Sequence, residues 1–197
     1  MQLFTSDGQR KYMTATERDK FKAAALELED KSVRMLCLML LYTGCRISEG
    51  LNVMIRSIDY EAQAVTFESL KKRRRGIFRQ VPLPSGYLDD LDLVFEITKK
   101  QKRSKTAKAL TERLWPVSRA TASRKIDDVM QAAGLSGIQA TPKGLRHSFA
   151  IHCLEKQIPL NLISRWMGHS SMATTAIYAN AIGQEERSIA ERLWSNG

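Results

Sequence analysis

The sequence predicts a mainly helical domain that carries one small antiparallel β-sheet, an α+β fold. Two observations support this fold class. Apolar residues recur at helical spacing along most of the 197-residue chain, and the period changes to a two-residue alternation in two short segments, 64–70 and 77–83. A chain of this length fits one domain with short tails, and its 43% of apolar residues suffices for a buried core.

The predicted helices begin after a polar lead-in of residues 1–13. Thr14 and Glu17 have the spacing of a capping box, so the first helix should start there. The second helix, residues 32–42, is apolar nearly all round, which predicts burial, and Gly44 should end it. Further helices are expected over 87–100, 118–133, 142–154, 159–167, 174–181 and 185–194, with an exposed basic loop at 101–108.

The two alternating segments predict a hairpin of two strands. Pro82 and Pro84 should end the second strand. The tip of the hairpin is a basic run made of Lys71, Lys72, Arg73, Arg74 and Arg75. Such a run is usually a solvated loop, and in a functional interpretation most of its charges would contact phosphates.

The composition points to a polyanionic partner. Lys and Arg total 31 against 21 Asp and Glu, a formal net charge of +10, which favours nucleic acid. The three cysteines, Cys37, Cys45 and Cys153, are widely spaced and predict neither disulfides nor a zinc site. No secretory signal is visible, and the longest apolar run, 35–42, is too short to cross a bilayer. We therefore expect a soluble cytoplasmic protein without a membrane partner.

Transfer of a DNA phosphodiester needs a particular set of side chains. Arginines suit the extra negative charge of the transition state, because the guanidinium is planar and stays charged. A nucleophile must attack in line with the leaving group, and an acid must protonate the departing 5′ oxygen. A tyrosine nucleophile would retain the bond energy in a phosphotyrosine, so this route needs no ATP and no metal.

Four segments of the chain offer such a set. They are Thr43-Gly44-Cys45-Arg46-Ile47-Ser48-Glu49, the basic hairpin before Val81-Pro82-Leu83-Pro84, Leu145-Arg146-His147-Ser148-Phe149-Ala150, and Met167-Gly168-His169 with Thr174, Thr175 and Tyr178 after it. In this order, over residues 14–182, they resemble the boxes of the tyrosine recombinase (phage integrase) family. The resemblance implies the catalytic-domain fold of that family and a site-specific recombinase encoded by a bacterium, phage or plasmid.

The resemblance also implies a role for each matching residue. Arg46 and Arg146 would clamp the scissile phosphate, and Tyr178 would attack it to give a 3′-phosphotyrosine. His169 would hydrogen-bond the phosphate, and Glu49 would support the arginine site. A hairpin lysine would be the general acid: Lys71 is the first choice and Lys72 the alternative. No cofactor or metal is implied.

The chain departs from the family pattern at several points. Lys143 stands where the family usually has histidine; it still offers a cationic donor, but a lysine does not gain and lose its charge near neutral pH as imidazole does. Its role as proton acceptor from Tyr178 is therefore open. The hairpin tip is longer than usual, and we expect this chain to lack the N-terminal DNA-clamping domain that is usual in the family. We expect the catalytic domain over 14–183 and a terminal helix within 184–197 that packs in cis or on a neighbouring protomer.

Several of these residues also have an ordinary structural interpretation, and other functions are possible for the chain. Tyr178 alone would be an ordinary half-buried aromatic, and His147 and His152 would pack in the core, with His147 the nearer to the site. The expected partners are double-stranded DNA and further copies of the chain in a tetrameric synapse. Integrase, resolvase and inversion switch are not distinguished. The alternative functions are a DNA-binding regulator or accessory protein that keeps the fold with little cleavage, and a type IB topoisomerase.

Overall fold

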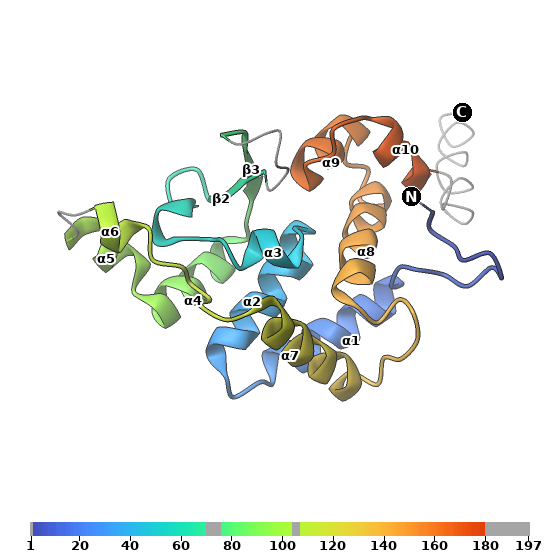
Figure 1. The fold of residues 1–197 in the computed structure, drawn as a ribbon, viewed down its shortest axis with the longest axis horizontal. Coiled ribbons are helices and arrows are strands. Elements are labelled where there is room, and N and C mark those ends of the chain that lie inside the picture. The colour runs from blue at the N-terminus through green and yellow to red at the C-terminus, as the bar shows by residue number, and fades with distance from the viewer. Residues whose placement is uncertain (1, 70–75, 104–106, 180–197) are drawn as a thin grey trace, which may run out of the picture.

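The computed structural model describes residues 2–69, 76–103 and 107–179 (Figure 1). It confirms a mainly helical fold with a small antiparallel sheet. In chain order the elements are α1 (Ala15–Leu26), α2 (Lys31–Thr43), α3 (Ile47–Gly50), the 3-10 helix η1 (Ile55–Ser57), β1 (Ile58–Asp59), β2 (Ala64–Glu68), β3 (Phe78–Pro82), α4 (Ser85–Phe95), α5 (Ile97–Arg103), α6 (Ala107–Leu110), α7 (Arg119–Ala132), α8 (Pro142–Glu155), α9 (Leu160–Met167) and α10 (Ala173–Ala179).

Helix α2 is the centre of the main core. It is buried along nearly its whole length, as its uniform apolar sequence predicts, and α1, α4, α7 and α8 pack around it. The polar tips of two buried aromatic residues are satisfied by its first turns: Trp115 Nε1 donates to the Ser32 carbonyl at 2.8 Å, and the Tyr87 hydroxyl donates to the Met35 carbonyl at 2.7 Å.

The sheet has the order β1-β2-β3 and both pairings are antiparallel. Its register sets Val65 opposite Val81, and both side chains are buried, so one face of the hairpin closes the core. The first strand was not predicted because two residues are too few to show an alternation. The basic run 71–75 lies outside the described residues.

Two predictions around residue 96 are wrong in detail. The single helix expected over 87–100 is interrupted at Glu96, whose φ of 52° ends α4. Helix α5 then starts because the Asp92 carboxylate accepts hydrogen bonds from the Thr98 backbone N–H at 2.7 Å and the Thr98 hydroxyl at 2.6 Å. The loop expected over 101–108 is likewise helical in part, since α5 runs to Arg103 and α6 begins at Ala107.

Helices α8, α9 and α10 lie side by side (Figure 1) and share a second, smaller core cluster. It buries Phe149, Ile163, Met167 and Tyr178 together with Leu3. Leu3 comes from the segment before α1, where Phe4 pairs with Arg10 in an isolated antiparallel bridge. The polar composition of residues 1–13 gave no indication that one of them would complete this cluster.

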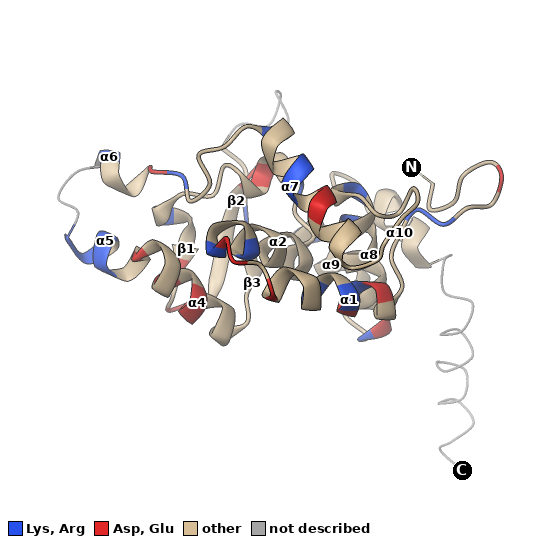
Figure 2. Ribbon diagram, turned by 90° about the horizontal axis from the view of Figure 1, so that it is seen from below, with Lys and Arg blue, Asp and Glu red and all other residues tan. Residues whose placement is uncertain are grey.

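The basic residues are spread over the molecule. Lys and Arg lie on α5, on α7 and in the segment before α1, and acidic residues accompany them on several helices (Figure 2). In the described part of the chain, no helix is both long and apolar enough to cross a membrane.

Candidate active site

The first arginine box forms the turn between α2 and α3. Gly44 ends α2 in the left-handed conformation, with φ of 58°, and a Cβ at this position would lie 2.4 Å from the Phe149 ring. Glycine is therefore required both by the backbone and by the close approach of α8. Arg46 is the N-cap of α3, and its backbone N–H donates to Glu49 Oε2 at 2.8 Å.

Glu49 is buried and pairs with two arginines. Its Oε1 accepts from Arg46 Nη1 at 3.0 Å and from Arg79 Nη1 at 3.2 Å, and its Oε2 accepts from Arg79 Nη2 at 2.7 Å. Burial is the largest single influence on the Glu49 pKa and raises it. The hydrogen bonds and charge of Arg79, followed by those of Arg46, outweigh burial, so that the pKa lies below its ordinary value and the carboxylate stays ionised.

Arg146 on α8 links the second arginine box to the first arginine box and to the histidine box. Its Nη1 donates to the Gly44 carbonyl and its Nη2 to the Met167 carbonyl, each at 2.6 Å. The side chain is buried, and burial followed by the charge of Arg46 lowers its pKa to about 10. Arg146 is therefore still charged at neutral pH. In contrast, the Arg46 side chain is 42% exposed.

His169 and Tyr178 lie against each other at the end of the domain. His169 follows α9, and its Nδ1 is 2.8 Å from the Thr175 hydroxyl on α10. The His169 and Tyr178 rings are parallel within 5°, with centroids 6.2 Å apart. This contact places the two residues of the last box in one local arrangement.

Tyr178 is fully buried and hydrogen-bonded to His147. The Tyr178 hydroxyl lies 2.9 Å from His147 Nδ1. Burial raises the Tyr178 pKa to about 12, although the charges of Arg146 and Arg46 act in the opposite direction. Burial, followed by the charges of Lys143 and Arg146, lowers the His147 pKa to about 4, so this imidazole is neutral at pH 7.

The structure brings Arg46, Glu49, Arg146, His169 and Tyr178 into one connected region, which is built by α3, α8, α9 and α10. Lys143 is an exposed residue in the first turn of α8, and its charge acts on His147. The remaining predicted residues, Lys71, Lys72, Arg73, Arg74 and Arg75, fall outside the described residues.

Two residues of this region were not assigned to it from the sequence. Arg79 sits on the same face of β3 as buried Val81, and an arginine at the inward phase of a strand signals a buried partner. His147 was expected to pack in the core near the site. Its direct bond to Tyr178 depends on how α10 lies against α8, which no sequence spacing shows.

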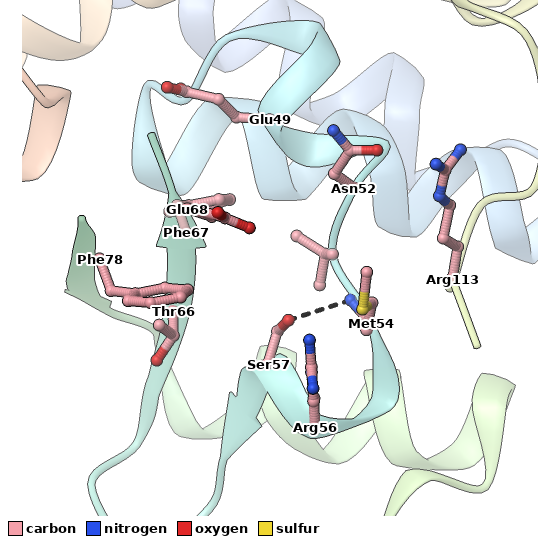
Figure 3. Close-up of a pocket in the computed structure, with 11 residues that line it drawn as sticks. Glu49, Asn52, Met54, Arg56, Ser57, Thr66, Phe67, Glu68, Phe78 and Arg113 are labelled. Carbon is pink, nitrogen blue, oxygen red and sulfur yellow. Dashed lines mark hydrogen bonds between the residues drawn. The ribbon is translucent and has the colours of Figure 1, made fainter. Parts of the chain in front are cut away.

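A pocket of about 460 Å³ opens beside this region, between the α3–η1 turn and the sheet (Figure 3). Glu49 lines it from α3, Phe67 and Phe78 from the strands, Arg56 from η1 and Arg113 from the segment between α6 and α7. A smaller hollow of about 190 Å³ is lined by Arg79, Gly168 and His169 among others. Glu49 and Arg79, which pair with each other, therefore each line one of the two hollows.

Comparison with known proteins identifies the class. The model of the phage integrase family matches residues 5–185, and the chain belongs to this family. Tyrosine recombinase XerA of Pyrococcus furiosus is 28% identical over 189 residues, which cover 90% of this chain and 60% of that protein. Tyrosine recombinase XerD of Mycobacterium tuberculosis is 33% identical over 165 residues, which cover 81% of this chain and 50% of that protein.

The fold agrees with solved recombinase structures. The post-cleavage complex of XerH site-specific recombinase with palindromic difH substrate superposes with a TM-score of 0.73 at 21% identity, covering 94% of this chain and 54% of the XerH chain. The chain thus spans about half to three fifths of the length of these relatives.

Proposed function

We propose that this chain is the catalytic part of a site-specific DNA recombinase that cleaves and rejoins DNA through a 3′-phosphotyrosine. The observation that carries the proposal is the connected arrangement of Arg46, Arg146, His169 and Tyr178 within a fold of the phage integrase family. Two arginines, an imidazole and a phenol in one region supply what transfer of a phosphodiester requires.

In the proposed reaction the Tyr178 oxygen attacks the scissile phosphorus and the bond from phosphorus to the 5′ oxygen breaks. Arg46 and Arg146 stabilise the charge that develops on the non-bridging oxygens, and His169 donates a hydrogen bond to one of them. The departing 5′ oxygen takes a proton from Lys71, or from Lys72 if the register of the hairpin differs by one residue. Lys143 supplies a further cationic donor, and the phenolic proton passes to solvent. No metal or cofactor takes part.

Burial of Tyr178 sets a condition on this reaction. A side chain with no exposed surface cannot reach a phosphate on bound DNA, so α10 must shift before attack. The charges of Arg146 and Arg46 already lower the phenol pKa against the effect of burial. If the phenol became exposed beside these arginines, burial would no longer raise its pKa, and the phenolate would be favoured.

The proposed partner is double-stranded DNA, since the XerH neighbour is described in complex with its difH substrate. We further propose a tetrameric synapse on DNA, a catalytic domain over residues 14–183 and a terminal segment, 184–197, that packs in cis or on a neighbouring copy. This segment lies outside the described residues. A cytoplasmic location fits this function.

The test is covalent trapping. The chain is incubated with a pool of duplexes that carry a randomised core and a nick near the centre, so that the short strand diffuses away after cleavage and the adduct persists. Protein–DNA adducts recovered under denaturing conditions are sequenced. An enzyme yields adducts enriched in one sequence, which also reveals the cognate site. Sequence-selective binding without any adduct would instead support a regulator or accessory protein.

A further inference from the structure

Arg79 makes three kinds of contact within the protein. Its Nη1 and Nη2 donate to the two oxygens of Glu49, and its Nε donates to the Trp166 carbonyl at 2.7 Å. Its guanidinium carbon lies 4.9 Å from the centre of the Phe67 ring. The side chain is only 9% exposed. A fork with this many partners is held in one orientation and is poorly placed to bind DNA itself.

The first consequence concerns the charge of the site. Glu49 also pairs with Arg46, and a carboxylate paired with Arg46 alone would cancel its positive charge. With Arg79 on the other side of the carboxylate, the four groups Arg46, Arg79, Arg146 and Glu49 retain a net charge of +2. A transition state at phosphorus that approaches two negative charges is matched by this surplus.

The second consequence concerns the end of α9. Arg79 binds the Trp166 carbonyl and Arg146 binds the next one, that of Met167. Cationic donors at the last carbonyls of a helix satisfy groups that have no partner within the helix. The chain then turns at Gly168, where a Cβ would lie 2.9 Å from Arg79 Nη1, and continues into His169. Arg79 therefore fixes the point from which His169 departs.

We propose that Arg79 is a positioning residue of the phosphate site, which holds Glu49 and the end of α9 so that Arg46 and His169 act on the same phosphate. This inference rests on the proposed function. Because β3 follows the basic run in sequence, Arg79 ties the strand after Lys71 to the first arginine box through Glu49 and to the end of α9 through the Trp166 carbonyl.

The test compares four variants, Arg79→Met, Arg79→Lys, Glu49→Gln and the double variant Arg79→Met with Glu49→Gln. Arg124→Met, which removes an exposed arginine of α7, is the control for loss of charge. Rates of adduct formation are measured in single turnover on the cognate nicked duplex, together with DNA affinity and melting temperature. Arg79→Lys keeps the positive charge, but a single ammonium cannot bind Glu49 and Trp166 together. This variant therefore distinguishes the effect of the charge from the effect of the guanidinium's several hydrogen bonds.

We expect Arg79→Met to slow cleavage at least about tenfold with DNA affinity nearly unchanged, and Arg79→Lys to recover part of the rate. If Arg79 acts through Glu49, its loss costs at least about threefold less in the Glu49→Gln background, since coupled residues are not additive. Folded Arg79→Lys protein that cleaves like the wild type, or an Arg79→Met effect of equal size in both backgrounds, would overturn the proposal.

A second measurement does not require cleavage. Inorganic phosphate is titrated into wild-type and Arg79→Lys protein, and the Nε–Hε resonances of Arg46 and Arg146 are followed by NMR. Weaker binding of phosphate by the variant supports the positioning role even if the wild type traps no DNA, which would refute only the proposed function. Equal phosphate binding by both proteins would refute the role of Arg79.

Discussion

The hydroxyl of Tyr178 lies 2.9 Å from Nδ1 of His147, and both side chains are without exposed surface. Nε2 of His147 has no hydrogen-bond partner within the part of the chain that the structure describes. Neutral imidazole tolerates this unpaired nitrogen far better than imidazolium would. The pair thus consists of a neutral phenol and a neutral imidazole, both of which resist charging while they stay buried.

The first prediction tests the nucleophile. Tyr178→Phe should abolish adduct formation and leave DNA affinity within about twofold, because the phenol oxygen is the one atom lost and it contributes little to binding ground-state DNA. Tyr87→Phe is the matched control, since it removes a buried hydroxyl that donates to the Met35 carbonyl of α2. Adduct on a denaturing gel from the Tyr178→Phe variant would show that another residue attacks.

The second prediction concerns the hydrogen bond between His147 and Tyr178. His147→Leu leaves the buried phenol without its partner, which costs about 1–3 kcal/mol and favours positions in which the phenol is exposed. Single-turnover cleavage should therefore rise about five- to tenfold. His152→Leu on the same helix is the control, because His152 contacts Glu155 instead. A slower His147→Leu enzyme would indicate that His147 takes the phenolic proton.

The third prediction follows from the pKa of His147, which burial lowers from 6.5 to about 4. Below pH 6.5 the unfolded chain binds a proton that the folded chain does not, so stability is lost as pH falls from 6.5 towards 4. Wild-type protein should lose about 1–3 kcal/mol more unfolding free energy between pH 7 and pH 4 than His147→Leu does. Denaturant unfolding at the two pH values measures this difference, and identical losses would place the titration elsewhere.

The fourth prediction separates the two clamping arginines. Arg46→Ala and Arg146→Ala should each slow cleavage at least about 100-fold, the usual scale for loss of one transition-state donor. Only Arg146→Ala should also lower the melting temperature clearly, because it leaves the Gly44 and Met167 carbonyls without their donor, whereas Arg46 is partly exposed. Calorimetry of both variants checks this contrast, and a near-wild-type cleavage rate would remove that arginine from the site.

The fifth prediction addresses the hairpin lysine, which lies outside the described residues. A 5′-thio leaving group needs no proton, so a duplex with this substitution should restore cleavage by Lys71→Ala. Lys72→Ala serves as the comparison on the same two substrates. Rescue of Lys72→Ala alone would move the general acid by one residue.

Local signals in the sequence predicted local structure well. Thr14 and Glu17 form the capping box expected of them, and Gly44 ends the buried helix that precedes it. The break at Glu96 was missed because it depends on Asp92 capping the next helix, which competes with an otherwise continuous helical pattern. The spacing of residues predicts where helices end and which faces they bury. It does not predict where a side-chain cap interrupts a continuous helical pattern.

In the candidate site, too, local features could be predicted from the sequence and contacts between distant residues could not. The boxes around Arg46, Arg146 and His169 were visible because each is short and contiguous. Arg79 and His147 act through partners that are 30 and 31 residues distant in sequence, Glu49 and Tyr178 respectively. Contacts of this kind arise only when helices and strands pack. The residue types can therefore be read from a single sequence, but which residues pair with each other cannot.

Leu3 has a practical consequence for anyone who produces this protein. It is buried in the cluster that also contains Tyr178, although it belongs to the polar segment that precedes α1. Replacement of Leu3 by a polar residue, or its loss by proteolysis, would remove an apolar side chain from the environment of the nucleophile. Preparations that keep Leu3 and preparations that have lost it should therefore differ in how readily Tyr178 reaches DNA.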